Sequence, residues 1–419
     1  MKRIVTLLTV LAILVPFSGC ANEEQPQNTL PSTEPIMDLT GYVVDGIMPY
    51  PDYTFSGDPS TLELRLRAVN AFKDLLSIRW SLSSEITYNK TGPVSGKTFH
   101  HDADVTYAGT IYSNANTGLF QFLEFYDFNT GRINYPGEVE EFKENVGASC
   151  ADAMIWGLTT VCNSITGPYY PVSMVYKNGY LPVGDYTYDF SISSYNYLPT
   201  YKIVEENGKE VILDAYTKVR PGDMFTSTPD NHGMMAISNP TVEYLSDGSI
   251  DTENSFIMIQ DQRGGQGSGF YEVKEDGQTI CYSGRTSAKF TFAQLLDKSY
   301  LPVTTAEFAG TKEYEVCTAT IDQSCYSVKD LLKATVSSNY PLAVVNVRIC
   351  DSYGNEQILG RELFSGGEKG GVPREYALSQ MECLQNFQSS DYCNSSYILR
   401  IEVVPSTGQR FMVAELPAQ

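Results

Sequence analysis

Residues 150 to 158 read Cys150-Ala151-Asp152-Ala153-Met154-Ile155-Trp156-Gly157-Leu158, an apolar run that begins with a thiol. Apolar side chains recur at helical intervals, at positions 151, 154, 155, 158 and 161, and this spacing predicts a helix with one buried stripe. Gly147 and Ser149 predict a turn and an N-cap just upstream. Cys150 then lies in the first turn, where unpaired N–H groups and the helix dipole favour the thiolate form of the side chain. The same N–H groups could stabilise the oxyanion that forms when this thiolate attacks a carbonyl.

A thiolate nucleophile needs a base, and His232 is the best candidate. It begins the run His232-Gly233-Met234-Met235-Ala236-Ile237, which reads as a strand downstream of a Pro221-Gly222-Asp223 turn. A second strand is predicted over Ser255 to Gln262. Its polar end, Asp261 or Gln260, would orient the imidazole as the third member of a triad.

Each residue also has a structural interpretation, because a cysteine in an apolar helix is usually a small buried hydrophobic residue. The order of helix, histidine strand and polar strand end favours the catalytic interpretation. This order resembles that of the NlpC-type and CHAP-type cysteine peptidases and amidases, which are papain-like enzymes of bacterial cell-wall turnover. The resemblance covers roughly residues 60 to 305 and implies Cys150 as nucleophile, His232 as base and Asp261 as third residue, with Gln260 as the alternative.

The resemblance also implies substrate-binding roles for two tyrosines upstream. Tyr107 and Tyr112 bound the segment Tyr107-Ala108-Gly109-Thr110-Ile111-Tyr112, where related secreted enzymes carry a Tyr-x-Gly segment of the substrate cleft. The chain departs from the commoner pattern, because Asp152 to Trp156 lacks the Ser-Gly-Phe that often follows the nucleophile. No second histidine of the family's type supplies the third role. The departures leave the substrate class open.

The first twenty residues resemble a bacterial lipoprotein signal. Lys2 and Arg3 precede an apolar stretch that is shorter than the roughly 20 residues of an ordinary membrane span, and Ser18-Gly19-Cys20 ends it. The resemblance implies lipidation of Cys20, although Phe17 stands where an aliphatic residue is usual, and ordinary secretion is the alternative. Residues 21–40 are expected to form a flexible tether at the extracellular face of a bacterial cell membrane.

The length of 419 residues suits an α+β chain of two domains. We expect a papain-like catalytic domain over residues 41–310 and a β-sandwich accessory domain over 311–419, because short strands and turns dominate the latter. A long helical pattern from Ser60 to Ile86 should pack beside the catalytic helix. The formal charge of −21, without a basic stripe, argues against a nucleic-acid partner.

No cofactor or metal is expected. The ligand-rich run His100-His101-Asp102-Ala103-Asp104 is interpreted as an exposed loop. Seven further cysteines leave an odd number for any disulfides, whose connectivity the sequence does not reveal.

The sequence therefore predicts a surface-anchored cysteine hydrolase that cleaves amide bonds, with a peptide or peptidoglycan fragment as substrate. Two alternatives stay open. Ser149 faintly resembles a serine nucleophile elbow, but no buried apolar strand precedes it. The other alternative is a non-catalytic surface binding lipoprotein on a papain-like scaffold, which would be favoured if Cys150 and His232 lie too far apart to meet.

Overall fold

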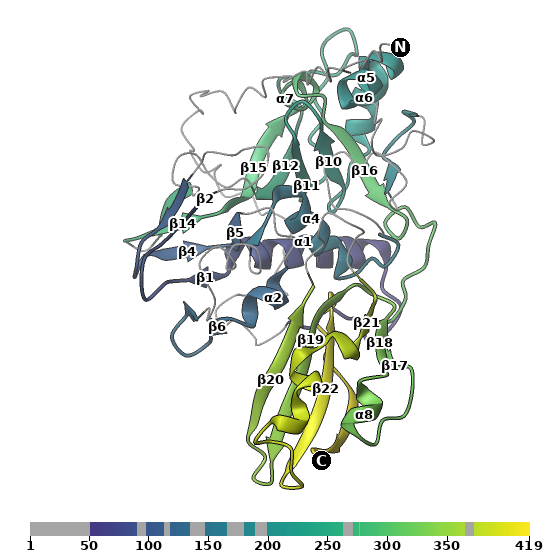
Figure 1. Ribbon diagram of the computed structural model, residues 1–419. Coiled ribbons are helices and arrows are strands. Elements are labelled where there is room, and N and C mark those ends of the chain that lie inside the picture. The colour runs from purple at the N-terminus through teal and green to yellow at the C-terminus, as the bar shows by residue number, and fades with distance from the viewer. Residues whose placement is uncertain are drawn as a thin grey trace, which may run out of the picture.

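The computed structural model describes residues 51–89, 98–112, 118–134, 147–165, 180–188, 199–262, 271–275, 277–364 and 373–419. Over these ranges the fold is α+β, with eight α-helices and several small sheets. The chain up to about residue 310 forms one body and the remainder a second body below it (Figure 1). The expected signal, Cys20 and the tether lie outside the described residues. None of the described helices is long and apolar enough to cross a membrane.

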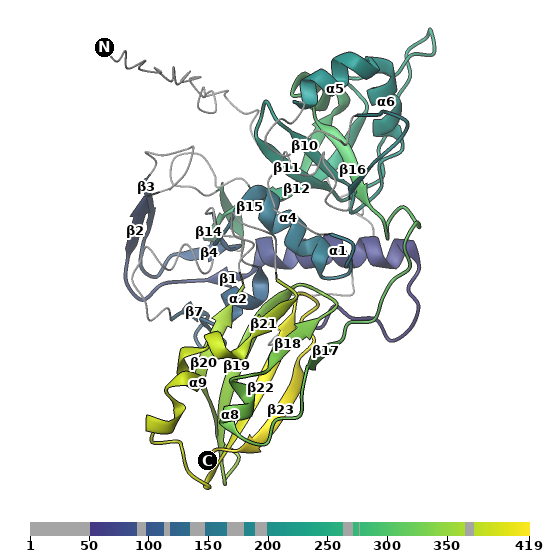
Figure 2. The ribbon, with the colours of Figure 1, turned by 45° about the vertical axis from the view of Figure 1, so that its right-hand side comes forward.

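A six-stranded antiparallel sheet forms the centre of the first body. Its order is β15-β12-β11-β10-β16-β9, with bounds Gly284–Thr291, Phe256–Gln262, His232–Ala236, Met224–Ser227, Leu301–Thr305 and Tyr180–Pro182. Helices α5 (Thr200–Asn207), α6 (Lys209–Thr217) and α7 (Phe292–Asp297) cover one face, and α1 (Thr61–Ser77) and α4 (Cys150–Thr159) lie on the other side (Figure 2). Alternate strand residues serve these two layers, because Met235 joins the core of α1 and α4 whereas Met234 joins that of α6.

Helix α1 is the long helix that the sequence predicts, but it is shorter than the apolar pattern. Ser60 caps its start in a capping box with Glu63. The helix ends at Ser77, and Arg79–Trp80 already form strand β1, so the pattern up to Ile86 combines a helix with strands. Leu62, which the pattern assigns to the apolar stripe, is exposed in the first turn.

Helix α4 is buried on every side rather than along one stripe. All ten of its residues are buried, as expected of a helix that is apolar all round. It packs on α1 through Gly157, where an added Cβ would lie 2.8 Å from Cβ of Phe72. The helix ends at Thr159, so Val161 belongs to the segment that follows.

The remaining elements of the first body are short. One sheet has the order β1-β4-β14-β13, with bounds Arg79–Trp80, Thr106–Ala108, Gln278–Tyr282 and Tyr271–Glu275. Three further pairs of strands are β2 (Ile86–Asn89) with β3 (Thr98–His101), β5 (Ile111–Tyr112) with β8 (Gly147–Ala148), and β6 (Tyr126–Asp127) with β7 (Arg132–Ile133). Helix α2 spans Leu119–Leu123. Gly147 therefore lies in a strand and not in the predicted turn.

Two antiparallel sheets and a shared apolar core form the second body. One sheet has the order β17-β18-β21, with bounds Ala319–Ile321, Thr335–Ser338 and Glu375–Ala377; the other has the order β20-β19-β22-β23, with bounds Glu356–Leu363, Leu342–Asp351, Tyr397–Pro405 and Phe411–Pro417. Helices α8 (Val328–Leu331) and α9 (Glu382–Gln385) complete it, and the core includes side chains of both sheets.

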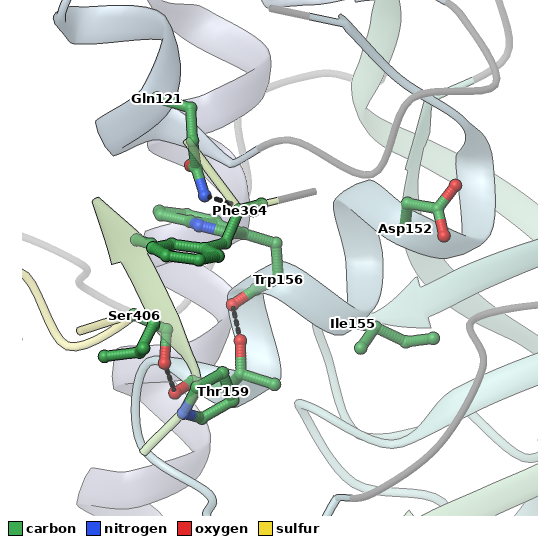
Figure 3. A pocket seen from close by; sticks show the side chains of 10 residues that line it. Gln121, Asp152, Ile155, Trp156, Thr159, Phe364 and Ser406 are labelled. Carbon is green, nitrogen blue, oxygen red and sulfur yellow. Dashed lines mark hydrogen bonds between the residues drawn. The ribbon is translucent and has the colours of Figure 1, made fainter. Parts of the chain in front are cut away.

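The second body contacts the C-terminal end of α4. Ser406 Oγ donates a hydrogen bond of 2.6 Å to the Thr159 carbonyl, which the helix end leaves without an intrahelical partner. Tyr340 Oη lies 2.8 Å from the Glu315 carbonyl oxygen and 3.3 Å from that of Val161, in the segment after the helix. A small pocket at this junction is lined by Trp156, Phe364 and Ser406 among others (Figure 3). Its lining includes neither Cys150 nor His232.

Candidate active site

Cys150 is the first residue of α4 because Ser149 caps the helix. Ser149 is extended, and its Oγ accepts a hydrogen bond of 3.4 Å from the Asp152 N–H. The preceding strand β8 pairs in parallel with β5, with Tyr112 opposite Ala148. This pairing places Tyr112 beside the start of the helix. Tyr112 forms a side-chain hydrogen bond with the buried sulfur of Cys150.

His232 and Asp261 meet because their strands are antiparallel neighbours. Met235 of β11 is the register partner of Gln260 of β12, so the start of β11 and the end of β12 lie at the same edge of the sheet. A register shift after Ile259 interrupts the regular alternation of side chains just before Asp261, and the side chains of His232 and Asp261 meet at this end of the sheet. His232 Nε2 lies 2.8 Å from Asp261 Oδ2, and both side chains are buried. The carboxylate only accepts, so the ring donates.

Gln260, the alternative third residue, faces α1. Its Nε2 donates a hydrogen bond of 3.0 Å to the Val69 carbonyl and lies 3.7 Å from Met235 Sδ. The contacts of the two side chains thus separate the two sequence candidates, because Asp261 and not Gln260 binds His232.

The imidazole of His232 also contacts the thiol. Burial raises the pKa of Cys150, but the charge and the hydrogen bond of His232, with further hydrogen bonds from the Gly233 N–H and Tyr112, bring this pKa below its ordinary value. Since Asp261 occupies Nε2, the ring nitrogen left for the sulfur is Nδ1. The arrangement favours a thiolate–imidazolium pair.

Asp261 remains ionised despite its burial. Burial raises its pKa, but Arg285 and His232 together hold that pKa far below the usual range. Arg285 binds both carboxylate oxygens, with Nε 2.8 Å from Oδ1 and Nη2 2.6 Å from Oδ2. Sequence reasoning did not find Arg285. Only the strand pairing of Asp261 with Arg285 identifies it.

Asp152 is a second acidic group near the thiol that the sequence did not assign a role. Burial raises its pKa well above the ordinary value, and the nearby Cys150 raises it further. Its Oδ2 accepts a hydrogen bond from Ser149 Oγ, and its Oδ1 has no hydrogen-bond partner among the described residues. The Ser149 hydroxyl is thereby committed to the cap, which weakens the alternative of a serine nucleophile.

The two tyrosines expected in the substrate cleft separate. Tyr112 lies beside Cys150, whereas Tyr107 is buried in the core, where its ring stacks on Trp80 at 4.8 Å between centroids. The Tyr107 hydroxyl accepts a hydrogen bond from the Asp102 N–H. The structure therefore brings Tyr112, and not Tyr107, to the candidate triad.

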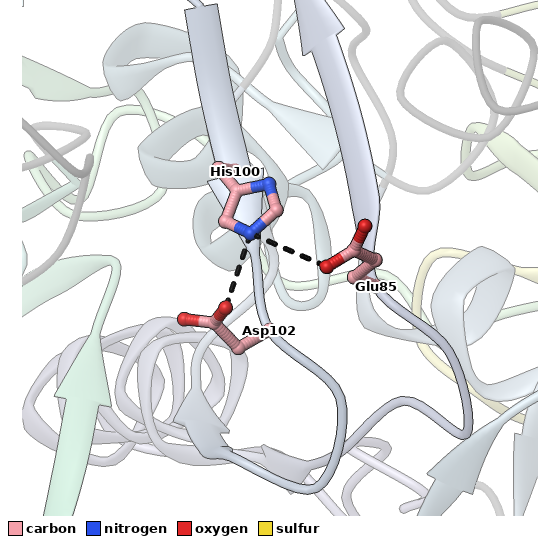
Figure 4. Close-up of side chains that lie close together, drawn as sticks. All are labelled: Glu85, His100 and Asp102. Atoms are coloured by element: carbon pink, nitrogen blue, oxygen red, sulfur yellow. Dashed lines mark hydrogen bonds and ion pairs between the residues drawn. The ribbon is translucent and has the colours of Figure 1, made fainter.

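The ligand-rich run at residues 100–104 is exposed only in part. His100 and Asp102 are exposed and lie together with Glu85, with His100 Nε2 3.0 Å from Asp102 Oδ1 (Figure 4). His101 is buried against Trp80 and does not belong to this group. Burial lowers the pKa of His101 to about 3, so this side chain is neutral. Exposed groups of this kind are common without a bound ion.

The cysteines of the described ranges are all free thiols. Cys162 is buried in the core, as expected. Cys20 lies outside the described residues.

Comparisons of the chain with protein-family models, with curated proteins and with solved structures found no match. The candidate site therefore rests on its own geometry.

Proposed function

We propose that this protein is a cysteine hydrolase that cleaves amide bonds, with Cys150 as nucleophile, His232 as base and acid, and Asp261 as the residue that orients the ring. One observation carries the proposal: a buried thiol at a helix start contacts an imidazole whose other nitrogen is bound to a buried carboxylate. A thiol held only for packing needs no such partners. The contact between Cys150 and His232 also removes the observation that would have favoured the binding-protein alternative, namely a separation too large for the two to meet.

The residues suggest the following sequence of steps. The thiolate attacks the amide carbon, forming an S–C bond, and the backbone N–H of Cys150 with the Tyr112 hydroxyl would bind the resulting oxyanion. The C–N bond then breaks as the His232 imidazolium gives its proton to the leaving nitrogen. Water attacks the thioester while His232 accepts its proton, and the thiol and a carboxylic acid are released.

The order of the three residues along the chain supports a papain-like enzyme similar to the NlpC-type and CHAP-type peptidases and amidases. The two C-terminal sheets are proposed to form a β-sandwich accessory domain. With lipid on Cys20, the enzyme would be held at the extracellular face of a bacterial cell membrane. A peptide of the cell wall, presented as a peptidoglycan fragment, is the proposed substrate.

Digestion of peptidoglycan fragments tests the proposal directly. Purified protein is incubated with the fragments, and the products are identified by mass spectrometry. We expect products one water heavier in total than the substrate, with a new amine and a new carboxylate. Cys150→Ala should abolish them, and Cys393→Ala, which removes a thiol of the second body, should not. Products that persist in Cys150→Ala would overturn the proposed nucleophile.

A further inference from the structure

The Asp261 carboxylate is shared between two cationic groups. Arg285 holds both of its oxygens, and Oδ2 also accepts the hydrogen bond from His232 Nε2. The side chain of Asp261 is 1% exposed and that of Arg285 12%, so water screens this contact little. Cys150, His232, Asp261 and Arg285 therefore form one continuous chain of contacts that begins at the thiol.

The fold fixes Arg285 in this position through the backbone. Arg285 is the cross-strand partner of Asp261, next to a register shift between β12 and β15 that follows Ile259. Gly284 allows the close approach of the two strands, because an added Cβ there would lie 2.4 Å from the Asp261 carbonyl oxygen. The guanidinium carbon of Arg285 also lies over the aromatic ring of Phe290, 5.0 Å from the ring centroid.

We propose that Arg285 is a positioning residue that holds Asp261, and that its fixed positive charge sets the pH range over which Cys150 is a reactive thiolate. The inference rests on the proposed function. A fixed positive charge behind Asp261 keeps the carboxylate ionised and its orientation constant through two parallel hydrogen bonds. The same charge offsets part of the negative charge that stabilises the imidazolium. Arg285 thus lowers the pH at which both Cys150 and His232 lose their protons.

Within the described ranges, charged and titratable groups on five elements lie along the contacts that begin at the thiol. They are Asp152 on α4, Tyr112 on β5, His232 on β11, Asp261 on β12 and Arg285 on β15. Arg285 is the member of this group that carries a fixed positive charge. Without the positive charge of Arg285, the loss of a proton from Cys150 or His232 costs more electrostatic free energy. The His232 imidazolium still keeps Asp261 ionised.

The test is the pH profile of Cys150 alkylation by iodoacetamide, read by peptide mass spectrometry of the full chain. The midpoint is the pH at which the alkylation rate of Cys150 reaches half of its maximum, and Arg285→Gln should move it upward by about half to one pH unit. Arg285→Lys keeps the charge and should restore the wild-type midpoint. Lys289→Gln is the matched control, because it removes a positive charge from the exposed side of the same strand and should leave the midpoint unchanged.

A purely structural role would lower the folded fraction without moving the midpoint, and an unmoved midpoint in folded Arg285→Gln would overturn the proposal. If that variant fails to fold, Asp261→Asn is compared with Asp261→Asn/Arg285→Gln, which leaves no unpaired buried carboxylate. The double variant must then have the higher midpoint, and equal midpoints would contradict the proposal. Failure of the proposed function would give a different result. In that case Cys150 would not react early with iodoacetamide even in the wild-type protein, and its assignment as the nucleophile would be contradicted.

Discussion

At the scale of single residues, the structure distinguishes two buried thiols of opposite character. Cys150 has its pKa lowered by His232 against the effect of burial. Cys162 lies just beyond the other end of α4. Its pKa is raised well above the ordinary value, mainly by burial and to a smaller extent by the Glu307 carboxylate. A buried cysteine is thus inert or reactive according to the charge beside it.

This contrast predicts selective labelling of the folded protein. At neutral pH iodoacetamide should modify Cys150 at least tenfold faster than Cys162, because only Cys150 has a large thiolate population. His232→Ala should slow the Cys150 reaction and leave that of Cys162 unchanged. Labelling is measured by mass spectrometry of peptides at timed intervals. Equal rates for the two cysteines in wild type would count against a catalytic Cys150.

Asp74 of α1 carries a prediction about stability and pH. Its carboxyl group is buried and accepts a hydrogen bond of 2.8 Å from the Tyr53 hydroxyl, and burial raises its pKa to about 6. A raised carboxyl pKa stabilises the fold fully below the unfolded value near 3.8, and this contribution is lost as pH rises through about 6. Charging Asp74 then costs the folded state about 3 kcal/mol near pH 8.

Asp74→Asn removes this cost while it keeps an oxygen for Tyr53. The free energy of unfolding should therefore rise by about 1–3 kcal/mol at pH 8, and the gain should shrink toward pH 5. Denaturant titrations at both pH values measure it, with the exposed Asp58→Asn as control. A gain that is larger at pH 5 than at pH 8 would contradict the assigned direction of the Asp74 pKa.

The residues that the sequence predicted and those that it missed differ for a physical reason. Cys150 and His232 could be predicted from local patterns, because one lies at a helix start and the other at a strand start. Asp261 and Gln260 were separated only by their contacts in the fold, which depend on how β12 lies beside β11 and α1. Arg285 lacked any local signal, because its role follows from a cross-strand contact 24 residues away in sequence.

At the scale of elements, helix α4 packs closely against α1 because Gly157 has no side chain at the point of contact. An added Cβ at Gly157 would lie 2.8 Å from Phe72 Cβ and 3.1 Å from the Ala68 carbonyl oxygen. The sequence indicated both helices and their contact, but an apolar pattern does not show how closely two axes approach. The start of α4, with Cys150, depends on this crossing.

Gly157→Val should separate the two helices. We expect a loss of about 1–3 kcal/mol in the free energy of unfolding from overpacking, with slower alkylation of Cys150 as the helix start shifts. Thermal unfolding and timed labelling measure the two effects. Gly57→Ala is the control, because nothing lies within 4 Å of a Cβ at that position. Unchanged stability in Gly157→Val would show that the crossing tolerates a larger side chain.

At the scale of the whole molecule, the two bodies share a core. Ala343, Val344 and Val404 of the second body belong to the same apolar cluster as α1 and α4. Arg374 donates a hydrogen bond to the Asn163 carbonyl, and Arg361 lies 3.2 Å from the buried Glu124 carboxylate. The sequence indicated a boundary near residue 310 but not this contact, because the side chains that form it are scattered over two sets of elements.

Removal of residues 312–419 should therefore destabilise the remaining chain and not simply release an independent enzyme. Truncation exposes the apolar side chains of α4 and leaves the Thr159 and Val161 carbonyls without their donors, so we expect a lower unfolding temperature and slow alkylation of Cys150. Ser406→Ala removes one of these donors from the intact chain and should cost about 1 kcal/mol. Ser389→Ala, whose hydroxyl serves an exposed turn, should cost less. A truncated chain that unfolds at the full-length temperature with unchanged Cys150 reactivity would show that the second body does not support the helix that carries the thiol.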